Sequence, residues 1–415
     1  MKHMWALILS LIIPSLIWGP FFPDLIVSFS ALVFLLYFVK KKNFYYFNNK
    51  PLIIFFIFCI YCILVSIFVA DDILFSFQSS LFYFRIGIFA CVIWYLIEKD
   101  QKLLNFFYYT LIICFSVLLV DSYFQFFFGM SITGEQLKDK GKYLLGDHNR
   151  IVSFFKDELI MGSYLSRLFP LLLALFVLKK KNKIELYSMI IFFTLVSSTI
   201  YISGERAAFF LHLISILFII IFMKNYKQMR LIMFVGFLII ISAFTLGNNH
   251  LKERMIKLPI NSVTNYVFTK NHDSIMRAAY NMFIDKPIFG HGPKMFRVLC
   301  KDDKYSTSSA RCATHPHNFY IQLLAETGIV GFSFLFSAFA YVLYCAYRQF
   351  KSIVLRQKRY LTDYQVCLLA GILITVWPLT TNGNFFNNWL MIVYSLPVGF
   401  YLHSIYGKNR ENISF

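Results

Sequence analysis

Two histidines flank a proline in the stretch 314-THPHNFYIQLLAETGIVGF-332, just before a long apolar run. An imidazole titrates near neutral pH, so His317 can act as a general base toward an approaching hydroxyl group. His315 and Asn318 are neighbours that can orient such a group or help to bind the substrate. The alternative for either histidine alone is a hydrogen-bonding residue at a membrane interface. A metal centre needs further ligands, and the other histidines and acids lack a recognisable ligand spacing, so we predict neither a metal nor another cofactor.

Two arginines stand where apolar runs begin or are interrupted. Arg206 follows a tight turn in "YISGERAAFF" and begins the next apolar run, where its guanidinium and the helix N-terminus can together hold a phosphate. Its alternative role is an interfacial anchor paired with Glu205. Arg277 lies on an otherwise apolar stretch that predicts an outer helix ending before Pro287. This arginine therefore points either to solvent or to a bound anion.

Three more arginines are candidates of less certain role. Arg150 precedes the sixth apolar run, where acids at 157 and 158 suit the dipole of a helix start, and we include it among the substrate-binding candidates. Arg85 and Arg167 lie inside apolar runs, where charge is costly and marks functional residues. They either line a cavity or pair with an acid, and the sequence does not rank these two roles.

The elements that must hold these residues are apolar helices. Of the 415 residues, 58% are hydrophobic and only 15% are charged. Apolar runs of about 20 residues span the roughly 30 Å hydrocarbon core of a bilayer as helices, and the period-two alternation of a membrane barrel is missing. We predict an all-α polytopic membrane protein that forms one transmembrane domain over residues 1–415. The twelve predicted spans are 4–19, 23–39, 51–70, 79–97, 103–121, 158–178, 184–202, 207–223, 231–247, 319–346, 364–379 and 387–405.

The basic residues orient these spans. In the twelve-span count, every short Lys/Arg cluster, such as 40–42 and 179–183, falls on one side, and the opposite short loops contain neither residue. The positive-inside rule then makes both termini cytoplasmic. Two longer segments lie outside, an outer segment at 122–157 and a large loop at 248–318 that ends at the histidine pair. Because the net charge of +19 sits in clusters beside apolar runs, it indicates contact with membrane lipids and argues against nucleic acid.

Two of the eight cysteines differ from the rest. Cys300 and Cys312 fall in the large outer loop, while the other six lie in apolar runs and serve as small core residues. In an oxidising compartment Cys300 and Cys312 can pair and close a short loop. We therefore identify them as a candidate disulfide.

Three motifs together resemble the bacterial O-antigen ligases and the related O-antigen polymerases. Residues 317–331 are similar to the family's H-[N/S/Q]-x9-G-x-x-G signature, with the spacing matched throughout. "SGERAA" at 203–208 resembles its S-G-x-R-x-A turn, and "DSIMRAAYNMFIDKPIFGHGPKMF" at 273–296 resembles its R-x3-W/Y…P-x-x-G-x-G segment. His315 and the basic, Cys-containing loop 294–312 are not part of the family signature, and we expect them to influence the choice of acceptor.

The resemblance implies an integral-membrane glycosyltransferase with a GT-C-like fold that inverts configuration and needs no metal. Its donor is a glycan on undecaprenyl diphosphate, on the periplasmic side of the bacterial inner membrane. In a ligase the acceptor is a sugar hydroxyl of lipid A–core, and in a polymerase it is another lipid-linked glycan. In this interpretation His317 is the general base, and Arg206 and Arg277 clamp the diphosphate. The glycines of the His-Asn motif serve mainly in helix packing.

Two alternatives remain open. We favour a ligase over an O-antigen polymerase because the outer segment 248–318 is large and falls just before the span that carries His317. A lipid or solute transporter is the alternative from another class of protein. It would show inverted repeats and broken helices near the midplane, and the sequence shows neither signal.

Overall fold

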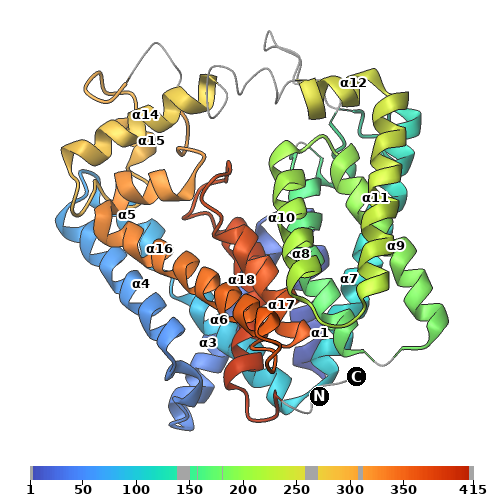
Figure 1. Ribbon diagram of the computed structural model, residues 1–415. Helices are drawn as coiled ribbons and strands as arrows, with labels where there is room; N and C mark the ends of the chain where they lie inside the picture. Colours follow the sequence, from blue (N-terminus) through green and yellow to red (C-terminus); the bar gives the residue numbers. More distant parts are fainter. Residues whose placement is uncertain are drawn as a thin grey trace.

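A computed structural model describes residues 3–137, 150–156, 158–179, 181–257, 270–306 and 312–410, and the regular structure in these ranges is helical (Figure 1). The N-terminal part contains α1 (Met4–Ser10), α2 (Ile12–Trp18), α3 (Phe21–Lys40), η1 (Tyr45–Phe47), α4 (Lys50–Phe68), α5 (Ile73–Ser80), α6 (Arg85–Lys99), α7 (Lys102–Phe128), η2 (Ser153–Phe155) and α8 (Met161–Leu178). The remainder contains α9 (Lys183–Ile202), α10 (Arg206–Phe222), α11 (Lys227–Gly247), α12 (Asn249–Lys252), η3 (Glu253–Lys257), α14 (Lys270–Asp285), α15 (Phe296–Leu299), α16 (Phe319–Val354), α17 (Asp363–Thr375) and α18 (Asn388–Tyr406). Parts of the predicted outer segments 122–157 and 248–318 lie outside the described residues.

Every predicted span coincides with an apolar helix. Within the described ranges, nine helices are long and apolar enough to cross a membrane. The three shorter apolar helices are Met4–Trp18, Arg206–Phe222 and Asp363–Thr375. The protein is therefore a polytopic helical membrane protein, and the number of twelve crossings stays a prediction.

Several boundaries differ from those predicted. α7 continues to Phe128, so the first residues of the predicted outer segment 122–157 still belong to this helix. α16 extends to Val354, and Gly328 interrupts it with non-helical backbone. α17 ends at Thr375, before the predicted end, because the residue preceding Pro378 is disfavoured in helical conformation. An irregular segment, 376–387, then leads to α18.

The centre of the bundle is α8, which is mostly apolar and almost entirely buried. α17 and α10 pack against it, and α6 packs against α18. By contrast, α3, α4, α11 and α16 expose large apolar side chains, among them Leu32, Ile60 and Leu231. Apolar surface of this extent on the outside of the bundle is what lipid chains would cover.

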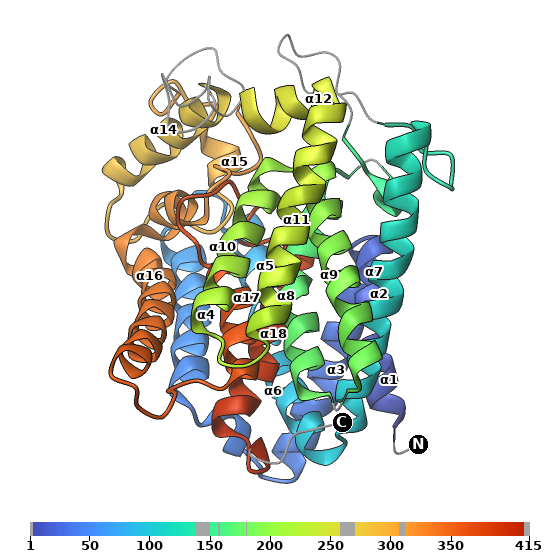
Figure 2. The same ribbon diagram turned by 45° about the vertical axis from the view of Figure 1, so that its right-hand side comes forward.

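The two ends of the bundle differ in what they carry. Both termini lie at the same end, opposite to α12, α14 and α15 (Figures 1 and 2). At the end of the termini, His3 Nδ1 lies 2.6 Å from Asp100 Oδ2, and the backbone N–H of Lys408 donates to Glu98 at 2.9 Å. The connection between α6 and α7, which contains Lys99 and Lys102, therefore shares this end with both termini.

Candidate active site

α16 begins at the His-Asn pair because Asn318 caps it. The side-chain oxygen of Asn318 accepts hydrogen bonds from the backbone N–H groups of Tyr320 (3.0 Å) and Ile321 (3.1 Å). N–H groups at a helix start have no acceptor within the helix, so a side chain must supply one. The side-chain amide donates to the carbonyls of Pro378 (2.8 Å) and Thr380 (3.0 Å). Asn318 is 3% exposed. This buried amide therefore joins the start of α16 to the segment 376–387.

His317 stands directly before this cap. Its φ of 60° is a backbone conformation that residues other than glycine seldom adopt. Its carbonyl oxygen accepts a hydrogen bond from the N–H of Asn382 at 2.8 Å, which fastens this residue to the segment 376–387. The ring of His317 lies 4.2 Å from that of His315 and 4.9 Å from that of His272, between centroids. Three imidazoles thus gather where α14 meets the start of α16.

Two of these imidazoles are kept neutral. Burial, reinforced by the neighbouring imidazoles, lowers the pKa of His317 to about 3. Burial also lowers the pKa of His315 to about 4. Near pH 7 both rings are therefore neutral. A pKa this low makes His317 a weaker base than the ordinary imidazole expected from the sequence, so proton transfer to it requires that a bound substrate stabilise the charged ring. Within the described residues, no three His, Cys, Asp or Glu side chains are arranged to hold a metal ion.

Arg167 of α8 holds the residue that fastens His317. Its guanidinium donates to Asn382 Oδ1 at 3.1 Å and to the carbonyl of Ile374 at 3.1 Å. It also lies 3.9 Å from the centre of the Tyr394 ring. Arg167 is 4% exposed, so these neutral groups replace water around its charge. The sequence left two roles open for Arg167, lining a cavity or pairing with an acid. In the described chain its contacts are with neutral groups, so it does not pair with an acid there.

Arg85, the other arginine inside an apolar run, has a different role. Its Nη2 lies 2.5 Å from Asp24 Oδ1, and its Nη1 donates to the hydroxyl of Ser28 at 2.9 Å. Asp24 belongs to the first turn of α3, so the ion pair connects α3 with α6. Arg85 therefore takes the structural alternative, pairing with an acid.

The loop that follows α14 docks onto the interruption of α16. The backbone N–H of His291 donates to the carbonyl of Ala325 at 3.0 Å. Gly328 has φ 63° and ψ −167°, a region open essentially to glycine alone, and a Cβ there would collide with the backbone carbonyl of Ile288. The first glycine of the motif is therefore required by the docked loop, a reason different from the helix packing that we expected.

Glu205, in the turn between α9 and α10, serves the start of α8. Its carboxylate accepts hydrogen bonds from the N–H of Gly162 at 2.6 Å and from the hydroxyl of Ser163 at 2.8 Å. A guanidinium nitrogen of Arg150 lies 4.0 Å from the same carboxylate and donates to the carbonyl of Leu159 at 3.1 Å. Acidic groups are favourable at helix N-termini, so Glu205 stabilises α8 as well as meeting Arg150.

The same turn gathers arginines. Arg206 is the first residue of α10, and Gly204, two residues earlier, has φ 73°. Arg254 is 6% exposed and donates from Nε to the carbonyl of Gly204 at 2.6 Å. A Cβ on Gly204 would lie 3.5 Å from Arg150 Cγ. Three guanidinium-bearing side chains thus adjoin one turn, a grouping suited to oxyanions.

Arg277 lies on α14, which is the predicted outer helix, but it forms an ion pair with another residue of the same helix. Its Nε lies 2.6 Å from Asp273 Oδ2, one turn away, and its side chain is 65% exposed. From the same helix, His272 reaches His317. α14 therefore supplies the histidine cluster with an imidazole and presents Arg277 at the surface.

The comparison with known proteins now bears on this geometry. Residues 190–336 match the family model described as O-antigen ligase. This segment is therefore similar to the O-antigen ligase and polymerase family. The match runs from α9 into α16 and includes the arginine turn, α14, the docked loop and His317, so the resemblance predicted from the motifs is confirmed. Members are membrane glycosyltransferase-like enzymes, and the family implies lipid-linked glycan substrates. No curated protein matches the chain.

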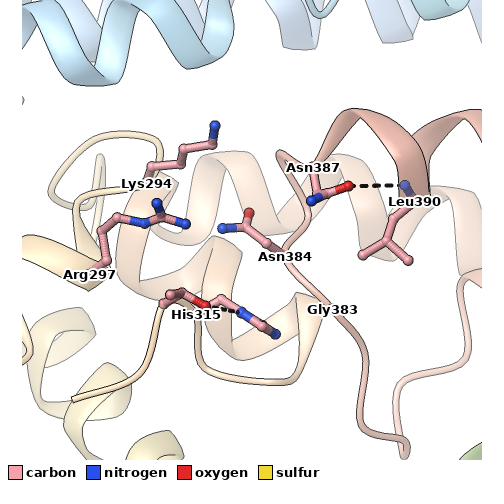
Figure 3. A pocket seen from close by; sticks show the side chains of 8 residues that line it. Lys294, Arg297, His315, Gly383, Asn384, Asn387 and Leu390 are labelled. Carbon is pink, nitrogen blue, oxygen red and sulfur yellow. Dashed lines mark hydrogen bonds between the residues drawn. The ribbon is translucent and has the colours of Figure 1, made fainter. Parts of the chain in front are cut away.

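The O-antigen ligase segment also forms one wall of a cavity of about 200 Å³ (Figure 3). Its polar lining comprises Lys294, Arg297, Thr314, His315, Asn384 and Asn387. Cys300 and Cys312, the candidate disulfide, are bonded, with a Cα–Cα distance of 5.4 Å. This bond fastens α15, which carries Arg297, to the stretch that leads to His315.

Sequence reasoning missed several residues of this candidate site. Arg254 and Arg297 belong to the long outer loop, whose charges carry little weight in the topology argument. Asn382 and Asn384 belong to "TTNGNFFNN" at 380–388, where polar residues interrupt two apolar spans. That interruption was the available signal, because polar residues there need a partner or a role. His272 offered no signal of its own.

Proposed function

We propose that the protein is an O-antigen ligase that transfers a glycan from undecaprenyl diphosphate to a sugar hydroxyl of lipid A–core. The observation that carries this proposal is His317, a neutral imidazole at the start of α16, inside the family motif and among two further histidines. Lys99 and Lys102, in the connection that shares an end with the termini, support a cytoplasmic location for that end of the bundle. The histidine cluster then faces the periplasm across the inner membrane.

The proposed reaction is one in-line displacement. The acceptor hydroxyl gives its proton to His317 while its oxygen attacks the anomeric carbon of the donor. The bond between that carbon and the diphosphate oxygen breaks, and undecaprenyl diphosphate leaves with the bonding electron pair. A single displacement inverts the configuration at the anomeric carbon. No metal ion takes part in this step.

The leaving diphosphate gains negative charge, and fixed guanidinium groups stabilise such charge as it develops. Arg206 is the foremost candidate because it starts α10, where the positive end of the helix dipole adds to its own charge. Arg150 and Arg254 adjoin the same turn. Arg277 supplies a further charge if α14 brings it toward a bound donor. Asn318 and His315 act by positioning, since Asn318 fixes the helix start and the ring of His315 contacts that of His317.

A transfer assay in cells tests this mechanism. His317→Ala and Arg206→Ala are introduced into a ligase-null host, and lipopolysaccharide capped with O-antigen is followed on a gel. We expect both variants to lose capping. His250→Ala and Lys252→Ala, two exposed residues of α12, are matched controls that should retain it. Normal capping by both active-site variants, at normal protein levels, would contradict the mechanism.

An O-antigen polymerase is the second candidate, because it uses the same donor and the same chemistry. We favour a ligase because α14, α15 and the docked loop form a large outer structure next to His317, which suits a bulky acceptor. Purified protein is given lipid-linked glycan with and without lipid A–core. Transfer that depends on the core supports a ligase, whereas elongated lipid-linked chains without the core identify a polymerase.

A further inference from the structure

The cavity beside His315 contains positive charge that nothing in its lining neutralises. Lys294 and Arg297 extend from one side, and Asn384 and Asn387 face them from the other (Figure 3). The described residues that line the cavity include neither Asp nor Glu. Two cations that share a small pocket repel each other, so an anion placed between them would be stabilised.

Asn384 points an unused donor into this cavity. Its side-chain oxygen accepts hydrogen bonds from Gln322 Nε2 at 3.0 Å and from the N–H of Phe386 at 2.8 Å, which fixes the orientation of the amide. Its Nδ2 has no hydrogen-bond partner among the described residues, although Asn384 is only 6% exposed. A buried donor without a partner costs about 1–3 kcal/mol, and a bound acceptor atom would remove that cost.

Arg297 and Lys294 also carry polar or charged groups that the surrounding protein does not fully satisfy. Arg297 Nε is buried and has no hydrogen-bond partner within the described chain. Burial, together with the neighbouring Arg297, lowers the pKa of Lys294, while Glu326 opposes this shift. Glu326 does not line the cavity, because its carboxylate is fully buried behind the wall and accepts from Gln322 Nε2 (2.9 Å) and Phe296 N–H (3.2 Å).

We propose that this cavity is a second oxyanion site that binds a phosphate group carried by one of the two glycan substrates. Two cations and an amide N–H converge on it, which is the donor set that phosphate oxygens prefer. His315 lines the cavity, and its ring centre lies 4.2 Å from that of His317, so a group bound here lies next to the proposed base. Only the identity of the molecule that carries this phosphate rests on the proposed function. The carrier is either a phosphorylated sugar of the acceptor or the diphosphate of the donor.

Phosphate binding can be measured without any transfer reaction. The full-length protein in nanodiscs is titrated with inorganic phosphate by calorimetry, as wild type and as Arg297→Gln, Asn384→Asp and Lys301→Gln. Lys301 is an exposed lysine of the same loop, so its variant is the charge-matched control. We expect Arg297→Gln to weaken phosphate binding at least tenfold and Asn384→Asp to weaken it further, because the new carboxylate faces the anion. Lys301→Gln should bind as wild type does.

Equal affinity in all four proteins, or no binding by the wild type at millimolar phosphate, would overturn the proposal. Melting temperatures identify a variant that fails to fold, and Arg297→Gln then carries the test because its side chain is only half-buried. Arg206→Ala separates this site from the arginine turn, since it should retain the phosphate binding that depends on Arg297. Failure of the proposed transfer function would leave these binding results unaffected.

Transfer assays then identify the carrier. If the acceptor carries the phosphate, Arg297→Gln raises the KM for the acceptor, and phosphatase treatment of the acceptor removes the difference from wild type. If the donor diphosphate occupies the cavity, Arg297→Gln raises the KM for the donor instead. Loss of phosphate binding with both KM values unchanged would contradict the assignment to a substrate.

Discussion

The guanidinium of Arg167 lies 3.1 Å from the side-chain oxygen of Asn382, whose backbone N–H holds the carbonyl of His317. A buried charge in the middle of the bundle therefore determines the backbone of the proposed base. A charged arginine is costly to place among membrane helices. Here that arginine fixes the position of His317 through Asn382. The site depends on the transmembrane core as well as on the outer loop.

We expect Arg167→Leu to lower kcat by about tenfold or more, because His317 loses the support of Asn382 while the substrate-binding arginines remain. Two buried acceptors lose their donor, which costs about 1–3 kcal/mol of unfolding free energy. KM should change little. Steady-state kinetics and thermal melting of the purified variant measure both effects. Arg85→Gln removes another arginine from the bundle and serves as the control: it should lower the melting temperature without a comparable loss of kcat. A proportional rise in KM, or unchanged kcat, would contradict the positioning role.

Acidification should destabilise the outer end of the protein. The folded-state pKa values of His315 and His317, about 4 and about 3, lie below the ordinary value of 6.5. Between these values the unfolded chain binds more protons than the folded chain, so stability is fully present above about pH 6.5 and falls as the pH decreases from there toward 4. Melting temperatures are measured from pH 4 to pH 8 for wild type and for His315→Gln/His317→Gln. The double variant should show the shallower decline, and identical slopes would contradict the expectation.

Gly328→Ala should prevent the loop after α14 from docking. The new Cβ meets the carbonyl of Ile288, and alanine cannot adopt the backbone of Gly328 without strain. We expect a large loss of folded protein, measured by size-exclusion chromatography of detergent extracts, and loss of transfer in whatever remains. Gly247→Ala is the matched control, because a Cβ there has no neighbour within 4 Å in the described structure. If both variants fold equally well, the docked loop does not need this glycine.

Reduction of the Cys300–Cys312 bond should weaken transfer. The bond closes a short loop, and such cross-links typically contribute about 2–4 kcal/mol. Without it, α15 and the stretch leading to His315 lose their connection. We expect a thiol reductant to lower activity of the wild type, and Cys300→Ser/Cys312→Ser to have the lower activity already and to be insensitive to the reductant. Cys62→Ser, at a buried free cysteine, should respond to the reductant as wild type does. Full activity of the double variant would show that the link is dispensable.

The helices were predictable from the sequence because a bilayer demands runs of apolar residues of one length, and all twelve runs are helical. His317 and Arg206 were proposed as site residues from their chemistry and spacing, and their roles stay predictions. The sequence did not reveal the interruption at Gly328, since apolar residues resume at Ile329 and glycine is frequent in membrane helices. It also did not reveal that Arg167, Asn382 and His317 meet, because residues this far apart in the chain share no periodicity. Arg277 was placed on the correct helix, and its ion pair with Asp273 follows from their i,i+4 spacing, which the sequence analysis did not use.

The cap of α16 has a consequence for protein engineering. Asn318 and His317 lie within the segment matched by the family, yet their hydrogen-bond partners, from Pro378 to Asn382, follow it, and Arg167 precedes it. A chimera that takes residues 190–336 from one relative and the rest from another would separate the histidine from its supports. Exchanging acceptor preference between such proteins therefore requires that α8 and the segment 376–387 be exchanged as well.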